Sequence, residues 1–240
     1  MVRGIYYGSS AMQYLDEKMD IVANNLANVE TNGFKRSNVA FNMHMVAEQA
    51  KQRDQIKNEL PQGKIFSYLE DTPGVIKQTS NPFNFALEGK GFFTIQTPEG
   101  IAFTRDGAFS MNEEGYLTTM DGNYVLGGYG PIRLEGKKFS LSDQGDILAD
   151  NLILDKFLLA DFHMDDLVSK GKNLLVPKMP GLEINEAQPL VKQGYLELSN
   201  VSIVNEMINM IAINRQYQAN DKAIKTNDDA LQKAVSQIAK

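Results

Sequence analysis

The sequence contains no cysteine and only two histidines among its 240 residues. The absence of cysteine excludes disulfides, thiol catalysis and zinc or iron–sulfur sites that depend on cysteine. It also leaves the chain indifferent to the redox state of its compartment, which suits a protein that functions outside the cytoplasm. The two histidines, His44 and His163, lie far apart and lack the spacing of metal ligands. We expect both to be surface or packing residues.

Positive charge and long apolar runs are also scarce. The chain has 24 Lys and Arg against 30 Asp and Glu, for a net charge of −6. Because no basic stripe stands out, nucleic acid is not an expected partner. No apolar run approaches the roughly 18 residues of a membrane span, so no transmembrane segment is expected. Residues 1–20 meet Asp and Glu too early for the apolar core of a signal peptide, so we expect any export to occur without cleavage.

Sequence signals for catalysis are missing too. There is no Gly-x-Ser-x-Gly elbow, and no Gly-Lys-Ser/Thr triplet closes a phosphate loop. The Asp-Gly turns lack the ligand spacing of a calcium loop. An enzyme with its site in the middle of the chain would need convergent polar groups, and no such set is visible. We therefore expect no enzymatic activity, no cofactor, no metal site and no small-molecule substrate.

A long amphipathic helix is predicted at the N-terminus. Its apolar residues are three, four or seven positions apart, which is typical of a heptad seam. The helix should end near Asn28, because Asn32 and Gly33 tolerate left-handed backbone angles. The seam consists of Ile5, Met12, Leu15, Met19, Val22, Leu26 and Val29.

A second long helix is predicted at the C-terminus. From Leu198 onward there is no Pro and no Gly, and Ser199 or Asn200 is a candidate N-cap for a helix of roughly 35–40 residues. Asn214, Asp221 and Asp228 interrupt its apolar track, and they either set the register between packed helices or lie on a solvated edge. The track is Ile203, Met207, Met210, Tyr217, Ile224, Leu231, Val235 and Ile238, and Val204, Ile208 and Ile211 widen it.

Between the two ends the pattern changes to short strands cut by turns. Runs such as 92–97 and 116–120 alternate with glycine-containing turns, which predicts antiparallel hairpins. The expected fold class is α+β, with long N- and C-terminal helices that pair as a coiled-coil-like layer and a central, mainly antiparallel β domain. The expected parts are an N-terminal helical tail over 1–46, a connector over 47–82, the β domain over 83–193 and the C-terminal helix region over 194–240, of which 198–240 joins the N-terminal tail in an inner helical domain.

Three separate blocks of the sequence resemble one protein family. "NNLANVETNGFKR" (24–36) resembles the N-terminal signature of the flagellar basal-body rod and hook proteins, and "GYLELSNVSIVNEMINMIAINRQYQANDKAIKT" (194–226) resembles their C-terminal signature. Residues 81–127 are similar to the β domain of the rod members. Glu30 and Asn32 depart from the residues that the family shows more often. The blocks occur in the family's order and cover nearly the whole chain.

The resemblance implies a structural subunit of the periplasmic flagellar rod, exported by the flagellar type III apparatus without signal cleavage. Its implied partners are other copies of the chain, other rod proteins and the export apparatus. "GGYGPIRLEG" (127–136) and the opening residues are more similar to the proximal-rod type than to the distal-rod type. The subunit-interface residues expected on this basis are Leu15, Met19, Val22, Asn25, Leu26, Asn28, Val201, Val204, Met207, Ile208, Met210, Ile211, Tyr217 and Ile224.

Two other functions stay open from the sequence. A distal-rod or hook-type subunit would carry the same signatures. A secreted β-rich interaction module would use its helices for ordinary dimerisation and would form a discrete oligomer with stable tails. A rod subunit should instead leave its helical seams uncovered as a monomer and order them on assembly.

Overall fold

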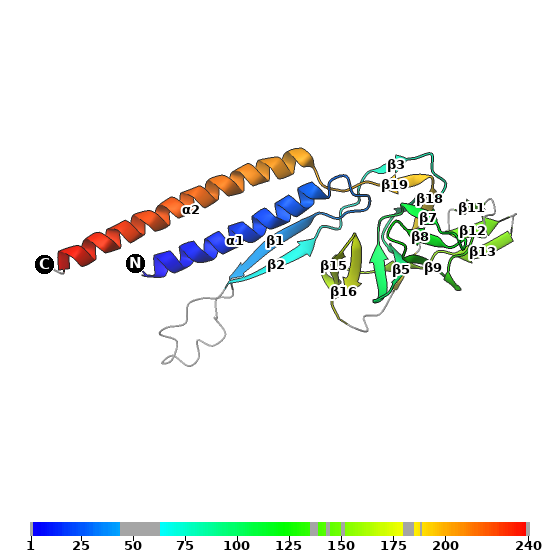
Figure 1. The fold of residues 1–240 in the computed structure, drawn as a ribbon, viewed down its shortest axis with the longest axis horizontal. Helices are drawn as coiled ribbons and strands as arrows, with labels where there is room; N and C mark the ends of the chain where they lie inside the picture. The colour runs from blue at the N-terminus through cyan, green and yellow to red at the C-terminus, as the bar shows by residue number, and fades with distance from the viewer. Residues whose placement is uncertain are drawn as a thin grey trace. The chain divides into compact units, whose positions relative to one another are not determined.

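The computed structural model describes residues 2–43, 63–134, 139–142, 145–149, 152–179, 185–187 and 189–238 (Figure 1). His44 and the first part of the predicted connector, 47–62, lie outside these residues. The chain divides into two units. Unit 1 comprises 1–27, 37–68 and 202–240, and unit 2 comprises 28–36 and 69–201, so the chain crosses between the units four times.

Unit 1 contains two long helices, α1 (Val2–Ala27) and α2 (Ile203–Ile238), and a two-stranded sheet of β1 (Ser37–Met43) and β2 (Gly63–Leu69). The helices run antiparallel, side by side (Figure 1). They meet in a small hydrophobic cluster whose buried members are Leu15, Val22 and Ile213. Further along, Gly8 allows α1 and α2 to approach each other closely, because a Cβ added at Gly8 would lie 2.9 Å from Cγ1 of Ile224.

The predicted fold class is wrong in its account of the helices. The chain is mostly β, with nineteen strands in the described residues against one N-terminal and one C-terminal α-helix. The helices do not form the expected coiled-coil-like pair, because only three of the side chains that the structure describes are buried in their shared cluster. Met207 and Tyr217 of the predicted track are exposed, whereas Ile213, outside that track, is buried. The apolar face of α2 is wider than one track, so a neighbouring stripe of the helix turns inward.

The main sheet of unit 2 has the strand order β15-β16-β6-β5-β9-β8-β7, with β10 on β9 and β14 joining β5 to β17. Its strand pairs are antiparallel, and the predicted antiparallel hairpins include β5–β6 and β8–β9. The region 157–177 contains strands and a short 3-10 helix (Met164–Asp166). The bounds are β5 (Phe92–Thr97), β6 (Gly100–Thr104), β7 (Phe109–Met111), β8 (Leu117–Thr119), β9 (Tyr124–Gly127), β10 (Gly130–Pro131), β14 (Leu159–Asp161), β15 (Leu167–Gly171), β16 (Leu174–Pro177) and β17 (Asn185–Glu186).

Three smaller sheets complete unit 2. One contains β11 (Phe139–Leu141), β12 (Asp146–Ala149) and β13 (Leu152–Lys156). In the other two, early strands pair with late ones: β4 (Phe85–Glu88) with β18 (Leu190–Gln193), and β3 (Ile76–Gln78) with β19 (Tyr195–Glu197). These two pairings bring the beginning and the end of segment 69–201 together.

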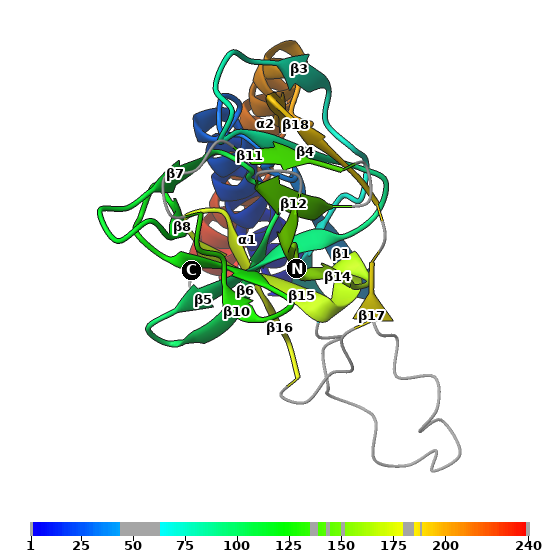
Figure 2. The same cartoon turned by 90° about the vertical axis from the view of Figure 1, so that its right-hand side faces the viewer.

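The core of unit 2 is built on β5, which is buried on both faces. Neighbouring strand residues point to opposite faces, so Phe93 and Ile95 join one hydrophobic cluster while Phe92 joins another. Figure 2 shows β4, β18, β11 and β12 lying together on one side of the main sheet. Their apolar residues fill the larger cluster, which includes Phe85, Leu87, Ile147, Val191 and the partly buried Phe139 and Leu141.

Candidate functional site

Several predicted interface residues are already covered within the folded chain. Leu15 and Val22 are buried in the cluster of unit 1, and Met19 and Met210 are partly buried against it. Leu26, Asn28 and Ile224 are half-buried, and Ile224 lies near Gly8 of α1. Val201 is buried in unit 2.

Asn25 is fully buried near the end of α1. Its Nδ2 donates a hydrogen bond to the Ser37 carbonyl at 2.8 Å, and its Oδ1 accepts one from the Ser37 N–H at 2.9 Å. One amide thus satisfies both backbone groups of a residue twelve positions away, and it ties the end of α1 to the start of β1. The sequence placed Asn25 at a subunit interface, and its described contacts are internal to unit 1.

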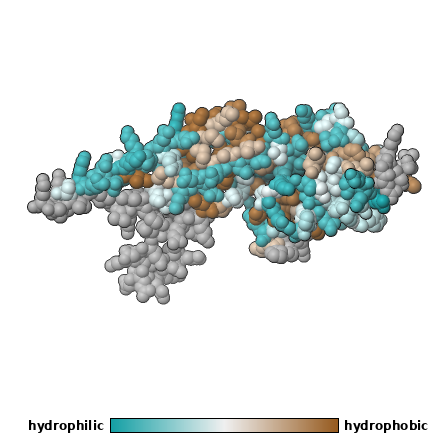
Figure 3. Space-filling model, viewed as in Figure 1, coloured by the Kyte–Doolittle hydropathy of each residue, from teal (hydrophilic) through white to brown (hydrophobic). Residues whose placement is uncertain are grey.

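The other predicted interface residues form an exposed stripe on α2. Val204, Met207, Ile208 and Ile211 follow the spacing i, i+3, i+4, i+7, which places them on one helix face. We call these four residues the α2 stripe. All four are exposed, Ile208 to 59%, and Tyr217 further along is exposed as well. Figure 3 shows hydrophobic side chains gathered over this first part of α2.

The polar residues that interrupt the apolar track bond within their own helix or face solvent. Asn214 donates to the Met210 carbonyl one turn earlier, and Asp221 forms an ion pair with Lys225 one turn later. Asp228 is exposed. Because these contacts are those of a single chain, a role of Asn214, Asp221 and Asp228 in setting register between packed helices stays a prediction.

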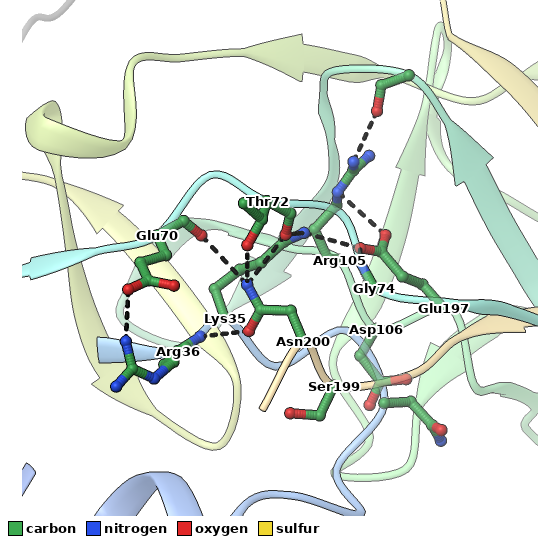
Figure 4. Close-up of polar contacts among 12 residues, drawn as sticks. Lys35, Arg36, Glu70, Thr72, Gly74, Arg105, Asp106, Glu197, Ser199 and Asn200 are labelled. Atoms are coloured by element: carbon green, nitrogen blue, oxygen red, sulfur yellow. Dashed lines mark hydrogen bonds and ion pairs between the residues drawn. The ribbon is translucent and has the colours of Figure 1, made fainter. Parts of the chain in front are cut away.

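A buried cluster of charges lies in unit 2 (Figure 4). Lys35 Nζ lies 2.7 Å from Glu197 Oε1, and the two side chains are only 4% and 1% exposed. Arg105 Nε lies 3.3 Å from the other carboxylate oxygen of Glu197, and its side chain is also buried. We call Lys35, Arg105 and Glu197 the charge cluster. They come from the stretch after α1, the end of β6 and the end of β19.

Backbone groups complete the surroundings of the Glu197 carboxylate. The Gly74 N–H donates to Glu197 Oε1 at 2.9 Å, and Lys35 Nζ donates to the Thr72 carbonyl at 3.0 Å. The Gly33 N–H donates to the Glu197 carbonyl at 2.7 Å. Gly74 is required there, because a Cβ would lie 1.8 Å from a backbone oxygen. The stretches that contain Gly33, Gly74 and Arg105 therefore all contact Glu197.

A second set of polar contacts borders the charge cluster (Figure 4). Asn200 Oδ1 accepts a hydrogen bond from the Arg36 N–H at 2.7 Å, while its Nδ2 donates to Thr72 O at 3.0 Å and Thr72 Oγ1 at 2.9 Å. Arg36 also pairs with Glu70 through their side chains. The Asn200 amide therefore joins its own segment to the stretches that contain Arg36 and Thr72, which are two of the stretches that also contact Glu197.

The charge cluster holds two cations for one carboxylate. Burial lowers the pKa of Lys35 and of Arg105, and the nearby charges of Glu197 and Asp71 oppose that shift for both. Arg105 Nη2 donates to the Gly89 carbonyl at 2.6 Å, whereas Nη1 has no hydrogen-bond partner in the described part of the chain. Loss of the one carboxylate would leave two buried cations without their ion-pair partner.

Asp106 follows Arg105 and borders a cavity of about 40 Å³ that Met120 and Lys172 also line. Burial raises the pKa of the Asp106 carboxyl to about 6, although the Ala108 N–H donates to its Oδ1 at 2.9 Å and acts in the opposite direction. Asp106 and Gly107 form one of the Asp-Gly pairs that are typical of turns, and burial of a turn carboxylate has no local sequence signal.

The charge cluster was missed by sequence reasoning. Lys35 and Glu197 are 162 residues apart, and no spacing rule connects them. The available signal was the resemblance itself, because Lys35 ends "TNGFK" in one signature block and Glu197 lies in "GYLELSN" of the other. In the described residues, no three His or acidic side chains come together as a metal site. Neither long helix is apolar enough over its described length to cross a membrane.

Comparison with known proteins gives three family matches in chain order. Residues 5–35 match the model of flagella basal body rod protein. Residues 86–149 match the D1 domain of flagellar hook protein FlgE/F/G, and residues 192–238 match the C-terminal part of flagellar basal body rod FlgEFG protein. Lys35 lies at the end of the first match, and Glu197 lies within the last.

Individual relatives align along nearly the whole chain. FlgF of Mesorhizobium japonicum is 31% identical over 242 positions, covering 94% of this chain and 98% of that protein. FlgG of Bacillus subtilis is 31% identical over 272 positions, covering 98% and 99%. FlgG of Buchnera aphidicola from Acyrthosiphon pisum is 30% identical over 260 positions, covering 97% and 98%. All three are named flagellar basal-body rod proteins.

Proposed function

Because this chain belongs to the family of flagellar basal-body rod proteins, it is a structural subunit of the flagellar basal body, and we propose that it assembles through the α2 stripe. The supporting observation is four apolar side chains on one helix face, all exposed in the single chain. Burying such a stripe against another subunit removes apolar surface from water, which favours association. The proposed partners are other copies of this chain and other rod proteins.

The proposal extends to transport and location. The subunit reaches the periplasmic part of the flagellum through the flagellar type III export apparatus, as family membership favours. Its role there is mechanical, with no catalytic step. The absence of cysteine from the sequence is compatible with an oxidising compartment.

Within the family, we infer the proximal-rod type, FlgF. The alignment with Mesorhizobium FlgF spans 242 positions, close to the 240 residues of this chain, whereas the alignment with Bacillus FlgG spans 272. The distal-rod type, FlgG, is the second candidate because its relatives are equally similar in identity. Electron cryotomography of motors that lack this chain separates the two: a rod that stops near its base supports the proximal type, and a rod that stops higher supports the distal type.

Ile208→Asp tests the α2 stripe directly. Because Ile208 is 59% exposed, the charge should change the free energy of unfolding of the monomer by no more than about 0.5 kcal/mol. In the rod it would bury an unpaired carboxylate, so we expect cells that carry it to form no complete rods and to lose motility. Circular dichroism melts of the purified chain and images of isolated basal bodies provide the two measurements.

The matched control is Gln216→Asp, which adds the same charge to another exposed position of α2 outside the stripe. It should leave both the monomer and the rod intact. Normal rods in the Ile208→Asp strain would remove the α2 stripe from the assembly proposal and leave the family assignment unchanged.

A further inference from the structure

The charge cluster lies where the chain enters and leaves unit 2. The four crossings fall at 27/28, 36/37, 68/69 and 201/202. Lys35 comes just before the second crossing, and Glu197 comes shortly before the fourth. Thr72 and Gly74, which bond Lys35 and Glu197, come shortly after the third. Each stretch of unit 2 that borders a crossing to unit 1 therefore supplies a member of the charge cluster or a residue that bonds to one.

We propose that the charge cluster is a latch that makes the docking of segment 28–36 and the docking of segment 194–201 mutually dependent. Each segment supplies the ionic partner that the other needs. The two segments then have two states: both are packed against the rest of unit 2, or both are released from it. The latch is a property of the folded chain and does not rest on the proposed rod function.

Charge burial provides the coupling. When segment 194–201 detaches, Lys35 and Arg105 lose the carboxylate that neutralises them, and an unpaired buried cation is costly in a low-dielectric interior. Lys35 regains water by leaving with segment 28–36. When segment 28–36 detaches first, Glu197 keeps Arg105 but loses Lys35 Nζ at 2.7 Å. Loss of Glu197 should therefore have a larger effect than loss of Lys35.

Backbone hydrogen bonds report the state of the two segments. The Gly33 N–H donates to Glu197 O at 2.7 Å. Because this bond joins the two segments, it opens when either of them detaches. The Leu198 N–H donates to Val75 O at 2.9 Å and reports the docking of segment 194–201. The Ile132 N–H donates to Val125 O at 3.0 Å inside unit 2 and reports the body of the β structure. Amide hydrogen exchange measures the opening of each bond separately.

The test is hydrogen exchange by NMR on the full chain with Lys35→Met and Glu197→Gln. Lys35→Met should accelerate exchange at Leu198, in the other segment, as well as at Gly33, by at least about tenfold. Glu197→Gln should accelerate both by at least about a hundredfold. Ile132 should be unchanged in Lys35→Met. The matched control is Glu88→Gln, which removes the exposed ion pair with Lys192 between β4 and β18 and should alter none of the reporters.

The double variant Lys35→Met/Glu197→Gln gives a result that simple loss of contacts does not. Glu197→Gln leaves two buried cations unpaired, and Lys35→Met removes one of them. Exchange at Leu198 should therefore be slower in the double variant than in Glu197→Gln alone. If Glu197→Gln alone gives no folded spectrum, a folded double variant supports the latch in the same way. Two results would overturn it: acceleration at Gly33 with none at Leu198 in Lys35→Met, or a double variant at least as destabilised as Glu197→Gln.

Discussion

The two units of the chain differ in how many apolar side chains they bury. Unit 1 has helices of 26 and 36 residues, yet among their described side chains three are buried in the cluster between them. Unit 2 buries thirteen apolar residues in one cluster and seven in a second. Because most helical stability in proteins comes from packing rather than propensity, the described side chains of unit 1 give its helices little support from burial, whereas unit 2 has a core of its own.

Both units bury charge. Unit 2 buries Lys35, Arg105 and Glu197 almost completely. Unit 1 buries Glu206 of α2, while the ion pair of Asp221 and Lys225 on the same helix is exposed. Buried ion pairs add little net stability, but they penalise every arrangement that leaves one member unpaired. On the two proposals above, unit 2 uses charge to specify how segments 28–36 and 194–201 dock, and α2 of unit 1 presents apolar surface for association.

The largest expected effect is in the core of unit 2. Phe93 is fully buried, and its ring lies 5.2 Å from that of Phe109 and 5.5 Å from that of Phe157. Phe93→Ala should lower the free energy of unfolding of unit 2 by about 3–5 kcal/mol through lost burial and the cavity left behind. Urea unfolding followed by tyrosine fluorescence measures it. Met120→Ala, at a residue 78% exposed, is the control and should stay within about 0.5 kcal/mol of the parent.

A smaller and more local effect is expected in unit 1. Ile213 is the buried contribution of α2 to the cluster with Leu15 and Val22, and Ile213→Ala should cost about 2–4 kcal/mol in the packing of the two helices. The loss should appear as reduced helical circular dichroism in the monomer, while amide exchange in unit 2 stays unchanged. Ile208→Ala removes an exposed side chain and is the control. Equal helix loss in both variants would contradict the division into a covered and an exposed face.

Features set by local rules could be predicted from the sequence. The strand predicted over 92–97 coincides with β5, because alternation and flanking glycines decide it locally. The N-terminal helix ends at Ala27, close to the predicted Asn28, and Gly33 has the left-handed φ of +65° expected after a helix end. The C-terminal helix begins at Ile203, slightly later than its predicted caps.

Features that depend on choosing among packing partners were not predictable. The apolar face of α2 spans two stripes, and periodicity cannot tell that Ile213 turns inward while Met207 and Ile208 stay exposed. The charge cluster joins Lys35 and Glu197 across 162 positions, and each residue alone has the sequence appearance of a surface charge. Burial of Asn25 is decided by the Ser37 backbone, which no side-chain pattern reveals.

The smallest expected effect is the stabilisation of unit 2 by a substitution at Asp106. Burial raises the pKa of Asp106 from 3.8 to about 6, so the folded state disfavours its charged form. The stability contributed by this group is fully present below pH 4 and is lost as the pH rises through about 6. Asp106→Asn should therefore raise the free energy of unfolding of unit 2 by roughly 1–3 kcal/mol at pH 7. The Asn Oδ1 can still accept the hydrogen bond from the Ala108 N–H.

Urea unfolding at pH 4 and pH 7 measures this pH dependence. The gain should be present at pH 7 and nearly absent at pH 4, where Asp106 of the parent is mostly protonated in the folded state. Lys172 lines the same cavity, but its ion pair is with Asp121 at 3.2 Å. Asp121→Asn is therefore the control: it removes a paired, partly exposed carboxylate and should give no gain. A parent chain whose stability is the same as that of Asp106→Asn at pH 7 would show that water in the cavity solvates the Asp106 carboxylate.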